Sequence, residues 1–245
     1  MTKTHPEDTA HVDQRVLLTH AVLVGLTPLI PVPFLDDVVR SAVERRMVRA
    51  IAKAHGRELT KAEAKALTED PSGNVLWAIG KGVVLFPFKL LFKTVFLVLE
   101  VKAASDEASR AYHQGVLFDL VLRSNALAPE GPRSAAEIRA AVRDVASGTT
   151  VSPLGRAIGG VFETSKGGLT AIGRALLARI GKGGKASAAA VEKAVEAAAE
   201  EAEGPMDSLL TRLTAAVAEV PGEHFDALRQ ALELELGVPL CRAAK

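Results

Sequence analysis

Cysteine and aromatic residues are scarce in this chain of 245 residues. Cys241 is the one cysteine, so an internal disulfide is impossible and a reducing compartment is the simpler interpretation. Aromatic residues make up 4% of the chain, and its apolar content is mostly Ala, Val and Leu, which favours helices over sheets. The chain also lacks a G-x-x-x-x-G-K-[ST] phosphate-binding loop and a nucleophile elbow. We therefore expect a protein that is not an enzyme and that carries no cofactor or metal.

An excess of charge of one sign is lacking as well. The formal net charge is +1, and no aromatic residues alternate with basic ones, so we expect no nucleic-acid partner. The N-terminus, MTKTHPEDTAHVDQR, has three acids and lacks the basic start and small-residue cleavage site of a signal peptide. These features predict a cytoplasmic protein, either peripheral or inserted as a hairpin at the inner face of the membrane.

No segment shows the alternation of a half-buried strand, so the sequence predicts an all-α fold. The expected architecture is a hydrophobic helical hairpin or bundle with a second, smaller helical region. By composition the chain divides into a disordered tail at 1–12, a hydrophobic helical module at 13–125, a linker with a short helix at 126–150, and a glycine-rich basic, then acidic, helical region at 151–245.

The first apolar run, Val16–Leu35, contains no Asp, Glu, Lys or Arg. Prolines at 28, 31 and 33 limit its continuous helix to Val16–Thr27. Twelve residues reach about 18 Å, which is too short for a hydrocarbon core of about 30 Å. We expect a buried or re-entrant helix here, and we expect His20 within it to be buried with its hydrogen bonds satisfied.

Residues Leu35–His55 have the spacing of an amphipathic helix, which Gly56 is placed to end. TKAE at 60–63 predicts a capping box for the next helix. Further helices are expected near 134–147 and near 223–236. The basic stripe of the 35–55 helix is either a solvated face or a contact site for anionic lipid or an acidic partner, and it consists of Arg45, Arg46, Arg49 and Lys53.

Residues 85–102, LFPFKLLFKTVFLVLEVK, are apolar enough for a membrane, yet Lys89 and Lys93 lie in their middle. In a bilayer span the two central lysines cost roughly 2.5–3.5 kcal/mol each, and about fifteen apolar residues return roughly 0.3–0.6 kcal/mol each, so the two sums nearly cancel. An in-plane or hairpin placement avoids this cost, because the lysines can reach the headgroups. A soluble core remains the other interpretation. In the membrane interpretation, Phe86, Phe88, Phe92 and Phe96 are the apolar anchors, and Lys89 and Lys93 contact headgroups.

Residues 151–185 are rich in glycine and in basic residues. Within them Leu169, Ile172, Leu176 and Ile180 recur at helical spacing, with Arg174 and Arg179 between them. This pattern is typical of a helix lying on an anionic surface, with the two arginines as lipid or acidic-partner contacts. The same pattern also fits a helix that packs on the rest of the protein.

Tyr112 and His113, with Asp106 and Glu107 nearby, have the residue types for acid–base chemistry. A deep polar pocket that collects His113, Tyr112 and Asp36 would favour an enzyme. Ser109 lies one helical turn before His113. Because no oxyanion loop accompanies them, we do not expect catalysis. Asp36 and Asp37 are better explained as acids at a helix N-terminus than as metal ligands.

Within residues 25–60, Pro31 and Pro33 form a Pro-x-Pro elbow, Asp36 or Asp37 follows it, and then come Met47, IAKAHG at 51–56 and Leu59–Thr60. This pattern resembles the YcjF-like hydrophobic helical domain family of bacteria. The resemblance implies an all-α, membrane-associated module of unsettled biochemical role, found fused or adjacent to Era-like or dynamin-like GTPases. The C-terminal 95 residues lie outside it. Because this chain has no phosphate-binding loop, any nucleotide chemistry would belong to a partner.

Two functions follow from these patterns. The first is a non-enzymatic, membrane-associated accessory or regulatory protein that contacts anionic lipid and a protein partner, for which the resemblance implies a GTPase. The second is a soluble all-α scaffold or adaptor that uses the same apolar helices as its core. The two functions make different structural predictions. A soluble scaffold requires that other helices of the chain cover the apolar helices, whereas a membrane protein does not.

Overall fold

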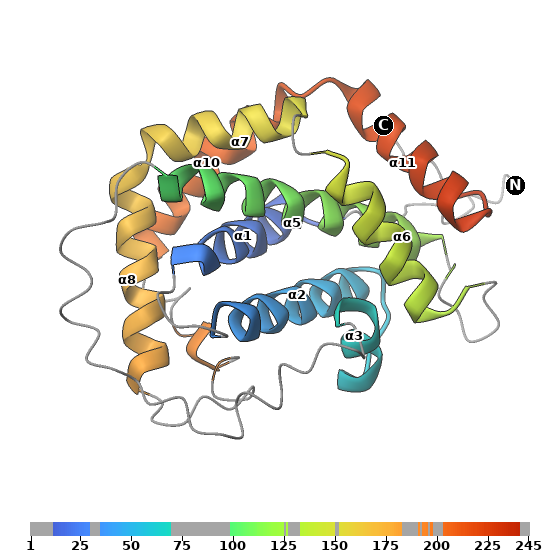
Figure 1. Cartoon of the computed structure of the whole chain (residues 1–245), viewed down its shortest axis with the longest axis horizontal. Coiled ribbons are helices and arrows are strands. Elements are labelled where there is room, and N and C mark those ends of the chain that lie inside the picture. The colour runs from blue at the N-terminus through green and yellow to red at the C-terminus, as the bar shows by residue number, and fades with distance from the viewer. Residues whose placement is uncertain are drawn as a thin grey trace, which may run out of the picture.

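The structure is a computed structural model, and every regular element that it describes is a helix, which confirms the all-α prediction. Figure 1 shows how these helices are arranged. The described residues are 12–29, 35–69, 99–124, 126, 133–149, 152–182, 191, 193–195, 197 and 203–240. The predicted tail at 1–12, apart from Val12, lies outside them.

The bounds of the helices are α1 Gln14–Gly25, the 3-10 helix η1 Thr27–Leu29, α2 Leu35–Ala54, α3 Lys61–Thr68, α5 Leu99–Arg123, α6 Ala135–Ser147, α7 Pro153–Thr164, α8 Lys166–Lys182, α10 Glu203–Ala218 and α11 Gly222–Leu236. Helices far apart in the chain lie side by side, since α10 packs against both α1 and α7.

Several helix ends lie where local sequence signals predict them. Gly56, just after α2, has a φ of 68°, and Gly237, just after α11, has a φ of 62°; this left-handed region favours glycine. Thr60 and Glu63 form both hydrogen bonds of the predicted capping box at the start of α3. Ser134 and Glu137 form a second capping box, at the start of α6.

Helix α5 lies at the centre of the bundle, and α1 runs antiparallel to it. A Cβ built on Gly25, at the end of α1, would lie 2.6 Å from the backbone oxygen of Ala104 and 2.8 Å from the Cβ of Ala108. A Cβ built on Gly115, farther along α5, would lie 3.0 Å from Leu17, near the start of α1. Glycine at both ends of the contact therefore allows the two helix backbones to approach closely.

Helix α2 packs parallel to α5, and polar contacts fix the register. Arg40 Nη1 lies 3.5 Å from Glu107 Oε2 near the first half of both helices. At the other end, His55 Nε2 lies 2.7 Å from Asp119 Oδ1, with both side chains largely buried. The His55–Asp119 bond therefore ties the residue after α2 to the last turns of α5.

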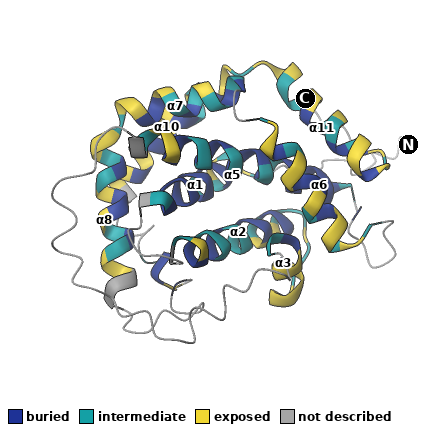
Figure 2. Cartoon of the chain, in the orientation of Figure 1, coloured by how far each residue is buried: buried dark blue, intermediate teal, exposed yellow. Residues whose placement is uncertain are grey.

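Helix α7 packs antiparallel to α5. A Cβ on Gly159 would lie 3.2 Å from Ser105 Oγ, and Ser152, the N-cap of α7, lies next to His113 of α5. Buried residues from α1 through α11 belong to one hydrophobic core, which Figure 2 shows as the dark inner faces of the helices. The residues before and after position 151 therefore contribute to the same core.

Three arginines donate to groups at the C-terminal ends of helices to which they do not belong. Arg57 Nη1 lies 3.4 Å from Leu122 O of α5, and Arg139 Nη1 lies 2.6 Å from Ala66 O of α3. Arg212 of α10 bonds the end of α7 three times, at Thr164 O, Thr164 Oγ1 and Ser165 Oγ. Terminal carbonyls lack partners within their own helix and carry the negative end of the helix dipole, so each arginine both satisfies and neutralises them.

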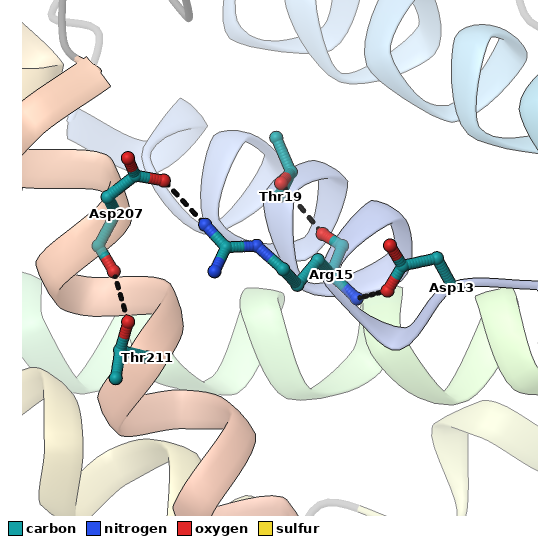
Figure 3. A network of polar contacts seen from close by, with 5 residues as sticks. All are labelled: Asp13, Arg15, Thr19, Asp207 and Thr211. Carbon is teal, nitrogen blue, oxygen red and sulfur yellow. Dashed lines mark hydrogen bonds and ion pairs between the residues drawn. The ribbon is translucent and has the colours of Figure 1, made fainter.

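Helices α1 and α10 are joined at the surface by one ion pair, shown in Figure 3. Arg15 Nη2 lies 2.5 Å from Asp207 Oδ1, and the two side chains are 46% and 57% exposed. Thr19 and Thr211 donate to backbone oxygens one turn earlier in their own helices, and Asp13 caps the start of α1. An ion pair this exposed contributes at most about 1 kcal/mol.

We expect replacement of Arg212 by alanine to lower the free energy of unfolding by about 1–2 kcal/mol, because the end of α7 loses its charged donor. Arg15→Ala is the matched control, since it removes an arginine that bonds only one exposed carboxylate. Urea denaturation of the two variants measures both values. An equal, small loss in both would contradict the capping role of Arg212.

Candidate functional site

The predicted membrane anchors cannot be placed, because Phe86, Phe88, Phe92, Phe96, Lys89 and Lys93 all lie outside the described residues. Among the helices that the structure describes, none is both long enough and apolar enough to cross a bilayer.

The basic stripe of α2 is divided between two environments. Arg45 is half-buried and forms an ion pair with Glu69 just after α3. Arg46 is also half-buried, close enough to His20 of α1 to affect its ionisation. Arg49 and Lys53 are exposed. The part of the predicted contact site that faces outward therefore consists of Arg49 and Lys53.

Helix α8 turns its apolar side inward. Leu169, Ile172 and Leu176 are buried in the core, as the packed interpretation of this segment expects. Arg174 and Arg179 are exposed on its outer side. These apolar side chains are therefore occupied by protein contacts.

The residues weighed for acid–base chemistry are not gathered into one site. Asp36 lies in the first turn of α2, one turn before Arg40. Because Arg40 pairs with Glu107 in the first half of α5, Asp36 lies near the beginning of α5 and away from His113. Tyr112 is buried and bonds with Gln14, and burial raises the pKa of its hydroxyl to about 12. His20 is buried as predicted, with Nδ1 2.7 Å from Val16 O, and burial lowers its pKa to about 4.

His113, which is buried, and His224, which is half-buried, form a pair between α5 and α11, with their Nε2 atoms 2.9 Å apart. The ring centroids are 5.1 Å apart and the rings are nearly perpendicular. This centroid distance is close to the nitrogen–nitrogen distance plus the two ring radii, so the rings meet head to head. This alignment is that of an N–H···N hydrogen bond. Two histidines that bind one metal ion instead direct their nitrogen lone pairs to the metal, which lies off the line between the two nitrogens.

The tautomers of the pair follow from the neighbouring atoms. Nδ1 of His113 lies 2.7 Å from Ser109 O, and because a carbonyl only accepts, Nδ1 carries the proton. Nε2 of His113 is therefore the acceptor, and Nε2–H of His224 is the donor. Ser152 Oγ caps α7 and lies 3.5 Å from the same His113 nitrogen.

The environment of this pair disfavours positive charge. Burial lowers the pKa of His113 to about 4, with the bond to Ser109 O opposing the shift and His224 adding to it. Burial also lowers the pKa of His224. The N-terminus of α7 at Ser152 and the first turn of α11 both meet the pair, and helix N-termini repel cations.

A charged cluster joins α2, α5 and α6 around the half-buried Glu44. Glu107 accepts from Arg40 at 3.5 Å and from Arg110 at 3.0 Å, while Arg143 of α6 approaches Glu44. Burial raises the pKa of Glu44 to about 7, against the opposing influence of the three arginines. Sequence patterns did not reveal this cluster.

Comparison with family models, with curated proteins and with solved structures finds no match for this chain. No three or more His, Cys, Asp or Glu residues are grouped for metal binding in the part of the chain that the structure describes. The fold and side chains of the described residues define an all-α helical bundle held together by one apolar core and by polar contacts between its helices.

Proposed function

We propose that the protein is an all-α scaffold or adaptor, whose helices use their apolar faces for its own core and offer polar faces to a protein partner. The observation that carries this proposal is the enclosure of α1. From Val16 to Thr27 no residue is exposed, and the partners of α1 are α2, α5 and α10. A helix that is apolar nearly all round requires either lipid or protein around it, and here protein surrounds it.

The outward faces of the bundle support the same proposal. Leu234 of α11 is the exposed large hydrophobic residue among the described ones. Elsewhere the exposed positions carry charged, polar or small side chains, such as Arg49 and Lys53 on α2 and Lys166 and Arg174 on α8. Such faces suit contacts with an acidic protein surface. A GTPase remains the partner that the resemblance of residues 25–60 implies.

Membrane attachment is the second candidate, and the composition of residues 85–102 favours it. That segment combines apolar residues with Lys89 and Lys93, and its last four residues belong to α5. In this candidate the bundle would lie at the inner membrane surface, with the four phenylalanines in lipid and Arg49 and Lys53 toward anionic headgroups.

Fractionation of the untagged protein from its native cells tests the two candidates. The membrane pellet would be washed with high salt, then carbonate, then detergent. The scaffold proposal expects recovery in the soluble fraction as part of a protein complex. Release by detergent alone would replace it with the membrane candidate.

If the protein is found in the pellet, the double substitution Phe88→Asp with Phe92→Asp should release it, because two carboxylates strongly disfavour burial in lipid. Leu234→Asp is the matched control, since it places one carboxylate at a leucine that is 83% exposed. A double variant that keeps its location but unfolds more easily would assign the segment to the protein core.

A further inference from the structure

We infer that the His113–His224 pair is an acid-sensitive latch that holds α11 on the bundle and releases it when both rings are protonated. The pair is a direct polar link between α5 and the first turn of α11, through Nε2 atoms 2.9 Å apart. The inference concerns how one helix is held, and it does not depend on the proposed scaffold role.

The latch opens only when the pair binds a second added proton. Two neutral rings share one N–H···N bond. A first added proton leaves the bond intact, because His224 can bind it at Nδ1 and still donate from Nε2. A second added proton must bind Nε2 of His113, because Nδ1 already carries the proton donated to Ser109 O. Two N–H groups then face each other inside the protein, and the bond becomes a repulsion.

No carboxylate offsets this repulsion in the described part of the chain. From α5 the group beside the pair is Ser109, and from α7 it is Ser152, both uncharged. On α11 itself, Glu223 and Asp226 are exposed and are not bonded to either ring. The N-termini of α7 and α11 add positive potential at the same point.

Helix α11 is placed where it can be released without opening the rest of the core. It lies at the edge of the bundle in Figure 1, and its main contacts are with α6 and α5. Its inner side consists of Leu228, Leu232 and Leu236, which release would expose. A peripheral helix can open locally at a lower free energy than global unfolding requires.

The direction of the pH effect follows from linkage. Because the pKa of His113 is about 4 when α11 is docked and near 6.5 when the ring is in water, the released state binds the proton more readily. Acid therefore favours release, over the range from about pH 6.5 down to about pH 4. For His113 alone, the ratio of released to docked α11 should rise about a hundredfold between pH 7 and pH 4.

Hydrogen exchange of the full chain tests the latch. Protection factors of amides 222–236, corrected for intrinsic exchange, should fall about a hundredfold relative to those of α1 between pH 7 and pH 4. In His224→Gln the amide can donate at neutral pH and rotate to accept at acidic pH, so the relative protection of α11 should stay constant. A parallel loss in α1 and α11, or the same hundredfold loss in the glutamine variant as in the parent protein, would overturn the latch.

A second measurement needs no substitution. Nitrogen-15 NMR of the imidazoles should show His113 protonated at Nδ1 at neutral pH, and then two protonation steps for the pair. The backbone signals of 222–236 should change with the second step. Signals that change with the first step, or with neither, would contradict the proton count.

Discussion

Replacing Glu44 by glutamine should make the protein about 3 kcal/mol more stable at pH 8 relative to its parent, while leaving stability near pH 4.5 almost unchanged. The pKa of the Glu44 carboxyl is about 7 in the folded protein, raised from 4.5 mainly by burial. The folded state therefore holds a proton that the unfolded state has already lost. The contribution of Glu44 is fully present below pH 4.5 and disappears as the pH rises through 7. A difference of 2.5 pKa units corresponds to about 3 kcal/mol.

Comparing parent and variant at each pH isolates Glu44 from the buried histidines. His20 and His113 have lowered pKa values of about 4, so their contributions change in the opposite direction, and they are lost as the pH falls from 6.5 toward 4. Both proteins contain these histidines, so their effects cancel in the difference. Urea denaturation from pH 4.5 to 8.5 gives the difference curve.

A flat difference curve would contradict the raised pKa of Glu44. Glu44→Leu serves as a second variant, because it also removes the titrating group but fills the site with an apolar side chain. If ionisation of the carboxyl is the cause, the free energies of unfolding of the two variants should differ by the same amount at every pH. Their difference curves against the parent should then have the same shape. If only one of the two variants shows this dependence on pH, ionisation of the Glu44 carboxyl is not the cause.

The helices and their ends were predictable because their signals are local. The left-handed glycines at 56 and 237, the capping box at Thr60 and the burial of His20 each depend on residues within one or two turns. Backbone geometry and hydrogen-bonding needs act over this range, so a short stretch of sequence suffices to predict them.

The polar clusters were not predictable, because they depend on how distant helices pack. His113 and His224 are 111 residues apart in the chain, and nothing near either residue indicates the other. The basic stripe of α2 appeared to be one surface, yet packing of α3 turns Arg45 toward Glu69 and leaves Arg49 exposed. Helical periodicity predicts in which direction a side chain points from the axis of its helix. Which other helix or solvent lies in that direction is decided by the tertiary fold.

Gly25→Ala should lower the free energy of unfolding by about 1–3 kcal/mol, the usual cost of overpacking a well-packed core. The added methyl group would lie 2.6 Å from the Ala104 backbone oxygen and 2.8 Å from the Ala108 Cβ. Neither atom belongs to a flexible side chain, so α1 and α5 must move apart. This contact fixes the helix pair at the centre of the bundle, and its loss affects every helix packed on α5.

Gly160→Ala is the control, since it makes the same chemical change at an exposed position of α7 with no atom within 4 Å of the new Cβ. There alanine should stabilise the helix by up to about 1 kcal/mol, because glycine is the poorer helix former. Thermal and urea denaturation of the two variants should therefore give shifts of opposite sign. Stabilisation by Gly25→Ala would mean that α1 and α5 are not packed this closely, and the enclosure of α1 that supports the scaffold proposal would lose its basis.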